Sequence, residues 1–81
     1  MDKKLATLGE RIRRIRRERG VSQEAFAFSI GLDRAYYGAV ERGDRNVSAL
    51  NIMRIAVGLR VEVGALFPPL RVLRSLRPLP D

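Results

Sequence analysis

The sequence predicts an all-α fold, a compact domain of five helices, on three observations. Apolar residues recur at helical spacing, and no segment shows a strand-like alternation that competes with it. Capping side chains stand just before the periodic segments, and glycines stand at several of their ends. The 81 residues suffice for one small domain. We expect that domain over residues 1–67, followed by a C-terminal tail over 68–81 that is either a short helix or disordered.

The first helix is expected to begin at Thr7. Thr7 and Glu10 have the spacing of a capping box, in which each side chain satisfies a free backbone amide of the first turn. Leu8, Ile12 and Ile15 then recur on one helical face, and Gly20 ends the segment. Residues 1–20 contain eight basic and three acidic side chains, so this helix carries much of the formal charge of +7.

Two short helices follow, over about 22–30 and 33–42. Each opens on a residue whose side chain accepts hydrogen bonds from free first-turn amides, a serine in one and an aspartate in the other. Gly31 and Gly43 stand where the helices must stop. Two helices of this length joined by a tight turn are typical of the helix-turn-helix of DNA-binding proteins.

The fourth helix, about 49–59 and capped by Ser48, is apolar on two faces. One stripe fits the core, and we expect the second to face another chain, because a helix that is apolar nearly all round is usually buried nearly all round. The alternative is that its members are scattered surface residues. A fifth helix, roughly 62–67, ends before two prolines and would extend the apolar patch. The expected dimer interface consists of Leu50, Met53, Val57, Val63 and Leu66.

Composition excludes several kinds of chemistry. The chain has no cysteine and no histidine, so disulfides, zinc sites and the commonest general base are absent. We expect no catalytic residue, no metal and no cofactor, and the acidic residues are explained by helix caps and ion pairs. No apolar run approaches the ~20 residues that cross a bilayer. The polar start does not fit a secretory signal, so we expect a cytoplasmic protein.

Residues 7–67 resemble the Cro/CI-type (XRE-like) helix-turn-helix family of phage and bacterial transcription regulators. The resemblance implies a lambda-repressor-like DNA-binding domain with the helix-turn-helix at helices 2 and 3. A narrower resemblance, to the small dimeric controller proteins of restriction–modification systems, rests on residues 33–36 and 41–46. The matching signs are Ser22-Gln23-Glu24, Phe26-Ala27, Gly31-Leu32, Glu41-Arg42-Gly43 and Ile55-Ala56 with Leu59.

The resemblance implies that the third helix lies in the major groove of DNA, with its first residues at base edges. Arg34 can donate two hydrogen bonds to guanine, although a phosphate contact is the alternative. Ala35 offers a methyl group, and Tyr36 offers a ring and a hydroxyl. Ala39 stands where the family often has a long polar side chain, which reduces the surface for direct readout. The expected base contacts are therefore Arg34, Ala35, Tyr36 and Ala39.

The resemblance also implies contacts to the DNA backbone and one structural ion pair. The expected phosphate contacts are Gln23, Arg42, Arg45 and Asn46. Arg16 and Glu41 correspond to an ion pair between helix 1 and the end of helix 3. The remaining arginines of helix 1 are interpreted as a mostly solvated face; they are Arg11, Arg13, Arg14, Arg17 and Arg19.

Three residues depart from the pattern or leave alternatives open. Arg60 replaces the glycine that usually ends helix 4, so either this residue adopts the left-handed conformation or Gly58 ends the helix earlier. Gly38 either lets helix 3 approach DNA closely or is tolerated drift. Phe28 stands where a polar residue is usual, and it either packs on helix 1 or marks a contact site.

Two functions are consistent with these patterns. The first is a sequence-specific transcription regulator that binds double-stranded DNA as a homodimer on a roughly palindromic operator, with restriction–modification genes as the narrower implication. The alternative is an antitoxin-like or adaptor module that uses the same fold for assembly. Neither requires a membrane or a small-molecule ligand, and an enzyme is disfavoured because no nucleophile stands beside a base and the core is too small for a deep pocket.

Overall fold

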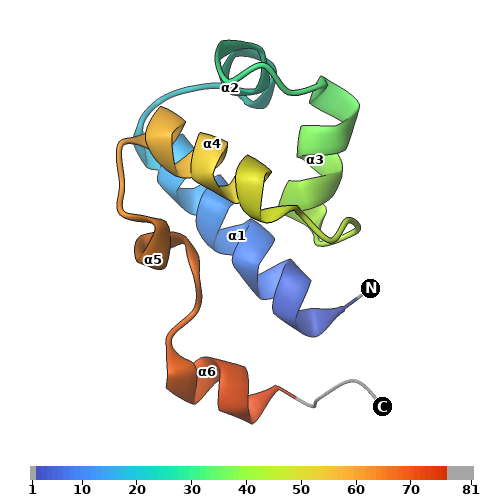
Figure 1. Cartoon of the computed structure of the whole chain (residues 1–81), viewed down its shortest axis with the longest axis vertical. Coiled ribbons are helices and arrows are strands. Elements are labelled where there is room, and N and C mark those ends of the chain that lie inside the picture. The colour runs from blue at the N-terminus through green and yellow to red at the C-terminus, as the bar shows by residue number, and fades with distance from the viewer. Residues whose placement is uncertain (1, 77–81) are drawn as a thin grey trace.

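The computed structural model describes residues 2–76, and all regular secondary structure in this range is helical. Figure 1 shows α4 running along α1, with α2 and α3 at one end of the molecule and α5 beside the other end of α4. The helix-turn-helix, α2 and α3, packs against this layer, and α3 contacts α1 directly. The helices are α1 (Lys3–Glu18), α2 (Gln23–Ser29), α3 (Arg34–Arg42), α4 (Ala49–Leu59), α5 (Val63–Leu66) and α6 (Leu70–Ser75).

The start of α1 differs from the prediction. Asp2 is the cap, and its carboxylate accepts hydrogen bonds from the amides of Lys4 and Leu5 at 2.7 and 3.3 Å. Thr7 lies inside the helix, where its hydroxyl donates to the Lys3 carbonyl at 2.8 Å. The capping-box interpretation of Thr7 was therefore wrong, because an equally good cap five residues earlier allows the helix one more turn.

The predicted caps of α2, α3 and α4 are confirmed. Ser22, Asp33 and Ser48 each accept a hydrogen bond from the backbone amide three residues on, at 3.0–3.1 Å. Gly43 ends α3 in the left-handed conformation, with φ of 80°. These local signals set where α3 begins and ends.

The first five helices share one apolar core. Within it, the ring centroids of Phe26 in α2 and Tyr37 in α3 are 5.3 Å apart. Leu66 of α5 is completely buried in this core, which corrects its assignment to the dimer interface. The four-residue α5 turns this side chain inward, and Val63 is left on the surface. The buried apolar residues are Leu8, Ile12, Phe26, Ala27, Tyr37, Val40, Ile52, Ile55, Ala56, Leu59 and Leu66.

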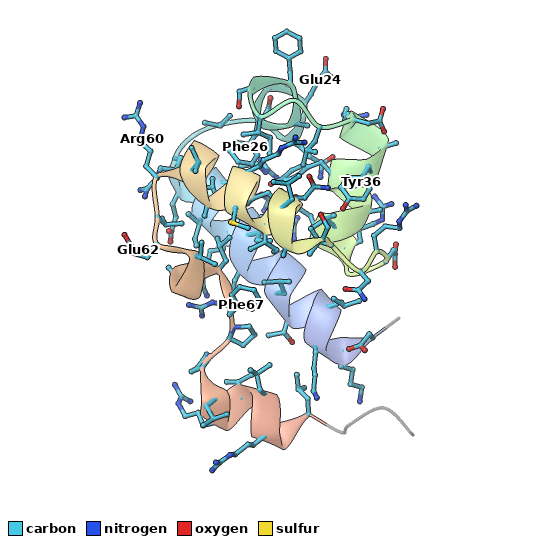
Figure 2. The ribbon with its side chains drawn as sticks, viewed as in Figure 1. Glu24, Phe26, Tyr36, Arg60, Glu62 and Phe67 are labelled. Carbon is cyan, nitrogen blue, oxygen red and sulfur yellow. The ribbon has the colours of Figure 1, made fainter. Side chains whose placement is uncertain are left out.

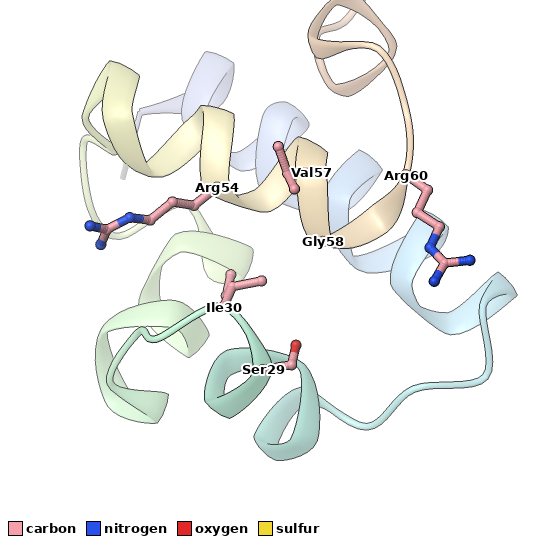
Figure 3. Close-up of a pocket in the computed structure, with 6 residues that line it drawn as sticks. All are labelled: Ser29, Ile30, Arg54, Val57, Gly58 and Arg60. Atoms are coloured by element: carbon pink, nitrogen blue, oxygen red, sulfur yellow. The ribbon is translucent and has the colours of Figure 1, made fainter.

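Two glycines let helices approach closely. A Cβ atom at Gly9 of α1 would overlap the backbone carbonyl oxygens of Val40 and Glu41, so this glycine allows α1 to lie against α3. A Cβ atom at Gly58 of α4 would lie 2.5 Å from Cγ2 of Ile30, and Figure 3 shows this residue, which directly follows α2, beneath α4. The helix-turn-helix is thus held against the scaffold by positions that exclude larger residues.

The end of α4 resolves one alternative. The helix continues through Gly58 to Leu59, and Arg60 follows in the left-handed conformation with φ of 60° and ψ of 45°. Arg60 is the only non-glycine residue with positive φ among residues 2–76, and its side chain extends from the end of α4 (Figure 3).

The C-terminal segment forms a sixth helix that stands apart from the other five in Figure 1. Phe67 lies between the five-helix body and α6 in Figure 2, and it is partly exposed, as is Leu70. Residues 77–81 of the expected tail lie outside the described part of the chain. Within residues 2–76, no helix combines the length and the apolar character that crossing a bilayer requires.

Candidate nucleic-acid interface

The first turn of α3 is presented at the molecular surface. The side chain of Arg34 is 64% exposed, Ala35 is also exposed, and Ala39 one turn later is half-buried. The only charged partner of Arg34 in the described residues is Glu24 of α2, with 3.9 Å between nitrogen and oxygen. An ion pair this exposed and this long is worth little, so the guanidinium is available to a ligand.

Tyr36 is half-buried beside Arg34 and is held from two sides. Its hydroxyl oxygen accepts a hydrogen bond from Nδ2 of Asn51 at 3.1 Å, and the Arg45 guanidinium lies 5.4 Å from its ring centroid. Figure 2 shows Tyr36 on the side of α3 that faces α4. Asn51 was missed by the sequence analysis, because nothing in its local pattern marks a first-turn asparagine of α4 as a partner of α3.

A buried ion pair ties α1 to the end of α3. Nε of Arg16 lies 2.7 Å from one carboxylate oxygen of Glu41, and Nη2 lies 3.1 Å from the other. Nη1 of the same guanidinium donates to the carbonyl of Val21 at 2.7 Å, in the connection to α2. The bidentate geometry fixes the orientation of three helices relative to each other.

The ionisation of this cluster follows from its partners. Burial opposes the charge of Glu41, but hydrogen bonds from Arg16 and Gln23 outweigh it and lower the pKa of this carboxyl below its usual value. The hydrogen bond to Glu41 raises the pKa of Arg16. Burial raises the pKa of the neighbouring Tyr37, so that phenol stays neutral. The pair is therefore charged on both sides at neutral pH.

Gln23, at the start of α2, extends this network to the surface. Its Nε2 donates to Glu41 at 3.0 Å. A Cβ atom at Gly38 would lie 3.2 Å from Oε1 of Gln23 and 3.3 Å from Nη1 of Arg42. The absence of a side chain at Gly38 therefore leaves room for two side chains that are expected to bind phosphate. Neither alternative from the sequence included this explanation for the glycine.

The last residue of α3 and the loop after it carry three of the expected phosphate contacts. Arg42 is exposed and pairs with Asp44 at 3.1 Å. Arg45 and Asn46 are also exposed, and Arg45 lies against the Tyr36 ring. Of the four expected phosphate contacts, Gln23 thus lies beside the second half of α3, and the other three lie at its end or in the loop after it.

Two arginines of α1 donate hydrogen bonds to the ends of other helices. Nε of Arg19 donates to the carbonyl of Leu59 at 3.0 Å, at the end of α4. Nη2 of Arg11 donates to the carbonyl of Ala65 at 3.2 Å, in α5. These two side chains contact the C-terminal carbonyls of other helices. Arg11 is half-buried and Arg19 stays exposed, so the interpretation of a solvated face is wrong for Arg11 but not for Arg19.

A strip of apolar side chains runs along the outer side of α4 and α5. Leu50 is 58% exposed and Val57 is 78% exposed. Phe28 is 86% exposed on α2, so it does not pack on α1. The strip consists of Leu50, Met53, Val57, Val63 and Phe67.

The helix-turn-helix family HTH_3 matches residues 12–66. Control protein C.MunI from Mycoplasma sp. is 43% identical over 60 residues, which are 73% of this chain and 81% of that protein. The crystal structure of the restriction-modification controller protein C.AhdI from Aeromonas hydrophila shares 51% identity at a TM-score of 0.76, over 78% of this chain and 96% of the other. The controller protein C.Esp1396I, solved as a tetramer on its natural 35 base-pair operator, gives a TM-score of 0.74 at 29% identity, over 93% and 95%.

Proposed function

This chain belongs to the helix-turn-helix family HTH_3, and from that premise we propose that it is a sequence-specific transcription regulator that binds double-stranded DNA. One observation carries the proposal. The capped first turn of α3 presents Arg34 to solvent with no strong partner in the described residues. A rigid helix that offers a free guanidinium at its N-terminal end has the geometry needed to read bases in a major groove.

Direct readout is assigned to one side of α3. Arg34 donates to the acceptor atoms of a guanine, and Ala35 contacts a thymine methyl. Tyr36 adds a hydroxyl, and Ala39 contributes only a small apolar contact. A single long polar side chain among the four implies a short base-specific footprint per subunit.

Contacts to the DNA backbone are assigned to the ends of α2 and α3. Gln23 lies at the N-terminus of α2, where free amides favour an anion. Arg42, Arg45 and Asn46 reach the flanking phosphates and fix the position of the protein without reading sequence.

We place the dimer interface on the outer strip of α4 and α5, so that two copies of α3 enter successive major grooves about 34 Å apart. Twofold symmetry then requires a roughly palindromic operator. The similarity to the restriction-modification controller proteins C.AhdI and C.Esp1396I supports restriction–modification genes as the regulated genes. A protein with this role acts in the cytoplasm, where its operator lies, and it catalyses no reaction.

Salt dependence tests the proposal. The duplex selected by the purified protein from a random pool should bind more tightly than a scrambled duplex. Its affinity should fall steeply with salt, with a log–log slope of ~0.9 per phosphate contacted. Titration by fluorescence anisotropy at several salt concentrations measures both quantities. No preference over the scrambled duplex, or no dependence on salt, would contradict the assignment.

The exposed side chain of Phe28 on α2 favours an adaptor function as a second candidate, because an exposed aromatic ring beside α3 could contact a partner protein. If the fold serves assembly, Arg34→Ala leaves capture of the partner protein unchanged, and no duplex is selected. If the fold serves regulation, the same variant loses its preference among duplexes.

A further inference from the structure

We propose that Asn51 of α4 is a positioning residue that makes the Tyr36 hydroxyl a hydrogen-bond donor to DNA. The inference rests on the proposed function and deepens it. It starts from the contact between two helices that the sequence did not connect, the 3.1 Å hydrogen bond from Nδ2 of Asn51 to the phenol oxygen of Tyr36.

The orientation of the Asn51 amide is set by its other neighbour. Nη1 of Arg54 donates to Oδ1 of Asn51 at 3.4 Å, and a guanidinium has no acceptor. The atom facing Arg54 must therefore be the amide oxygen, which leaves the NH₂ group facing Tyr36. Ser48 caps the backbone amide of Asn51 at 3.1 Å, so the main chain at this position is fixed as well.

The orientation of the Asn51 amide decides whether the Tyr36 hydroxyl donates or accepts its remaining hydrogen bond. A phenol has one proton, and its oxygen already accepts from Asn51. No group in residues 2–76 accepts a hydrogen bond from this hydroxyl. The proton is therefore free for an external acceptor, while the ring is held by the Arg45 guanidinium.

The external ligand is consequently a hydrogen-bond acceptor on DNA, either a phosphate oxygen or an acceptor atom on a base edge. Tyr36 follows Arg34 and Ala35 in the exposed first turn of α3. The amide of Asn51 would thus set which chemical group Tyr36 can recognise, although Asn51 itself need not touch DNA.

A double-mutant cycle tests the inference on the duplex that the unmodified protein selects from a random pool. Tyr36→Phe should lower affinity about tenfold, the usual effect of losing one hydrogen bond to a charged or buried acceptor. Asn51→Asp places a group that only accepts beside the phenol and draws its proton inward. We expect Asn51→Asp to lose about tenfold more affinity with Tyr36 present than in the Tyr36→Phe background.

Repulsion between the new carboxylate and DNA is present in both backgrounds and cancels in this comparison. Asn51→Ala should show the same coupling to Tyr36 at a smaller size. Thr7→Ala, a polar residue bonded only within α1, is the control and should bind like the unmodified protein. Circular dichroism and thermal unfolding establish the folded fraction of each variant, so that affinities refer to folded protein.

A scrambled duplex locates the acceptor. A loss confined to the selected duplex places it on a base, and an equal loss on both duplexes places it on a phosphate. Equal losses from the Asn51 substitutions with and without the Tyr36 hydroxyl would overturn the inference while leaving the proposed function intact. Failure of the unmodified protein to bind any duplex would overturn both.

Discussion

The pair of Arg16 and Glu41 shows how a single buried contact organises the surface proposed to face DNA. Arg16 satisfies the carboxylate with two donors and the Val21 carbonyl with a third. The same carboxylate accepts from Gln23, which lies at the start of α2. A half-buried residue expected to bind phosphate is thereby held by a buried carboxylate. Such pairs define an arrangement more than they add stability, but losing one partner leaves the other buried and unpaired.

We predict that Glu41→Gln lowers the free energy of unfolding by about 3 kcal/mol at pH 7, because Arg16 loses its counter-charge. The pKa of Glu41 is lowered in the folded protein, so its contribution is present above about pH 4.5 and is lost as the pH falls through the lowered value. The gap between the variant and the unmodified protein should therefore shrink in acid. Urea unfolding at pH 7 and pH 3 measures it. The exposed Glu10→Gln is the control, with an effect within about 0.5 kcal/mol.

Arg34 is the residue to which sequence preference is assigned. Arg34→Ala should reduce affinity for the selected duplex by roughly 1–3 kcal/mol, since a bidentate contact to guanine is lost. Affinity for the scrambled duplex should change much less. Arg17→Ala removes an equal charge from an exposed position on α1 and should leave the preference intact. A similar loss on both duplexes would assign Arg34 to a phosphate.

At the scale of the helices, the C-terminal end of α4 makes two contacts that require the helix to continue through Gly58. Gly58 lets it approach Ile30, which follows α2, and Arg19 at the end of α1 donates to the carbonyl of Leu59. Ending the helix earlier would break these contacts. The chain instead carries α4 through Gly58 and places Arg60 in a conformation that costs about 1–2 kcal/mol for residues other than glycine.

We predict that Arg60→Gly stabilises the protein by about 1 kcal/mol, because glycine adopts the left-handed conformation without a steric penalty. Arg60→Ala removes the same exposed side chain but keeps the penalty, so it should give no such gain. Thermal unfolding of both variants distinguishes relief of the backbone from loss of the charge. Equal effects of the two substitutions would contradict a backbone origin.

At the scale of the whole molecule, the outer side of α4 and α5 leaves a group of apolar side chains exposed to solvent. Leu50, Met53 and Val57 follow one another along α4, and Met53 lines one hollow together with Val63 and Phe67. Contiguous exposed apolar residues on a small domain mark a contact surface. Covering this strip with a second copy would also enlarge a core that is thin for a domain of this size.

We predict that Leu50→Asp or Met53→Asp converts the dimer to a monomer, because a carboxylate would be buried without a partner in an apolar interface. Sedimentation velocity measures the change. Phe28→Asp is the matched control, since it places the same charge on an exposed apolar position of α2 outside the strip. A dimer that persists in the α4 variants would place the interface elsewhere.

Much of the framework was predictable because it depends on neighbours in the chain. The serines and aspartate that cap α2, α3 and α4 act on amides three residues away, and Gly43 acts on its own backbone. Apolar spacing identified most of the core by the same local logic. The error at Thr7 is also local, because two residues compete to cap one helix and both satisfy the same rule.

Local patterns could not decide which partner each side chain meets. Leu66 and Val63 belong to the same apolar patch in sequence, but the direction of a four-residue helix buries one and exposes the other. Arg11 and Arg19 bind carbonyls 54 and 40 residues away, and Asn51 reaches Tyr36 on another helix. Burial and hydrogen-bond partners depend on atoms that only packing brings together, so these assignments required the folded chain.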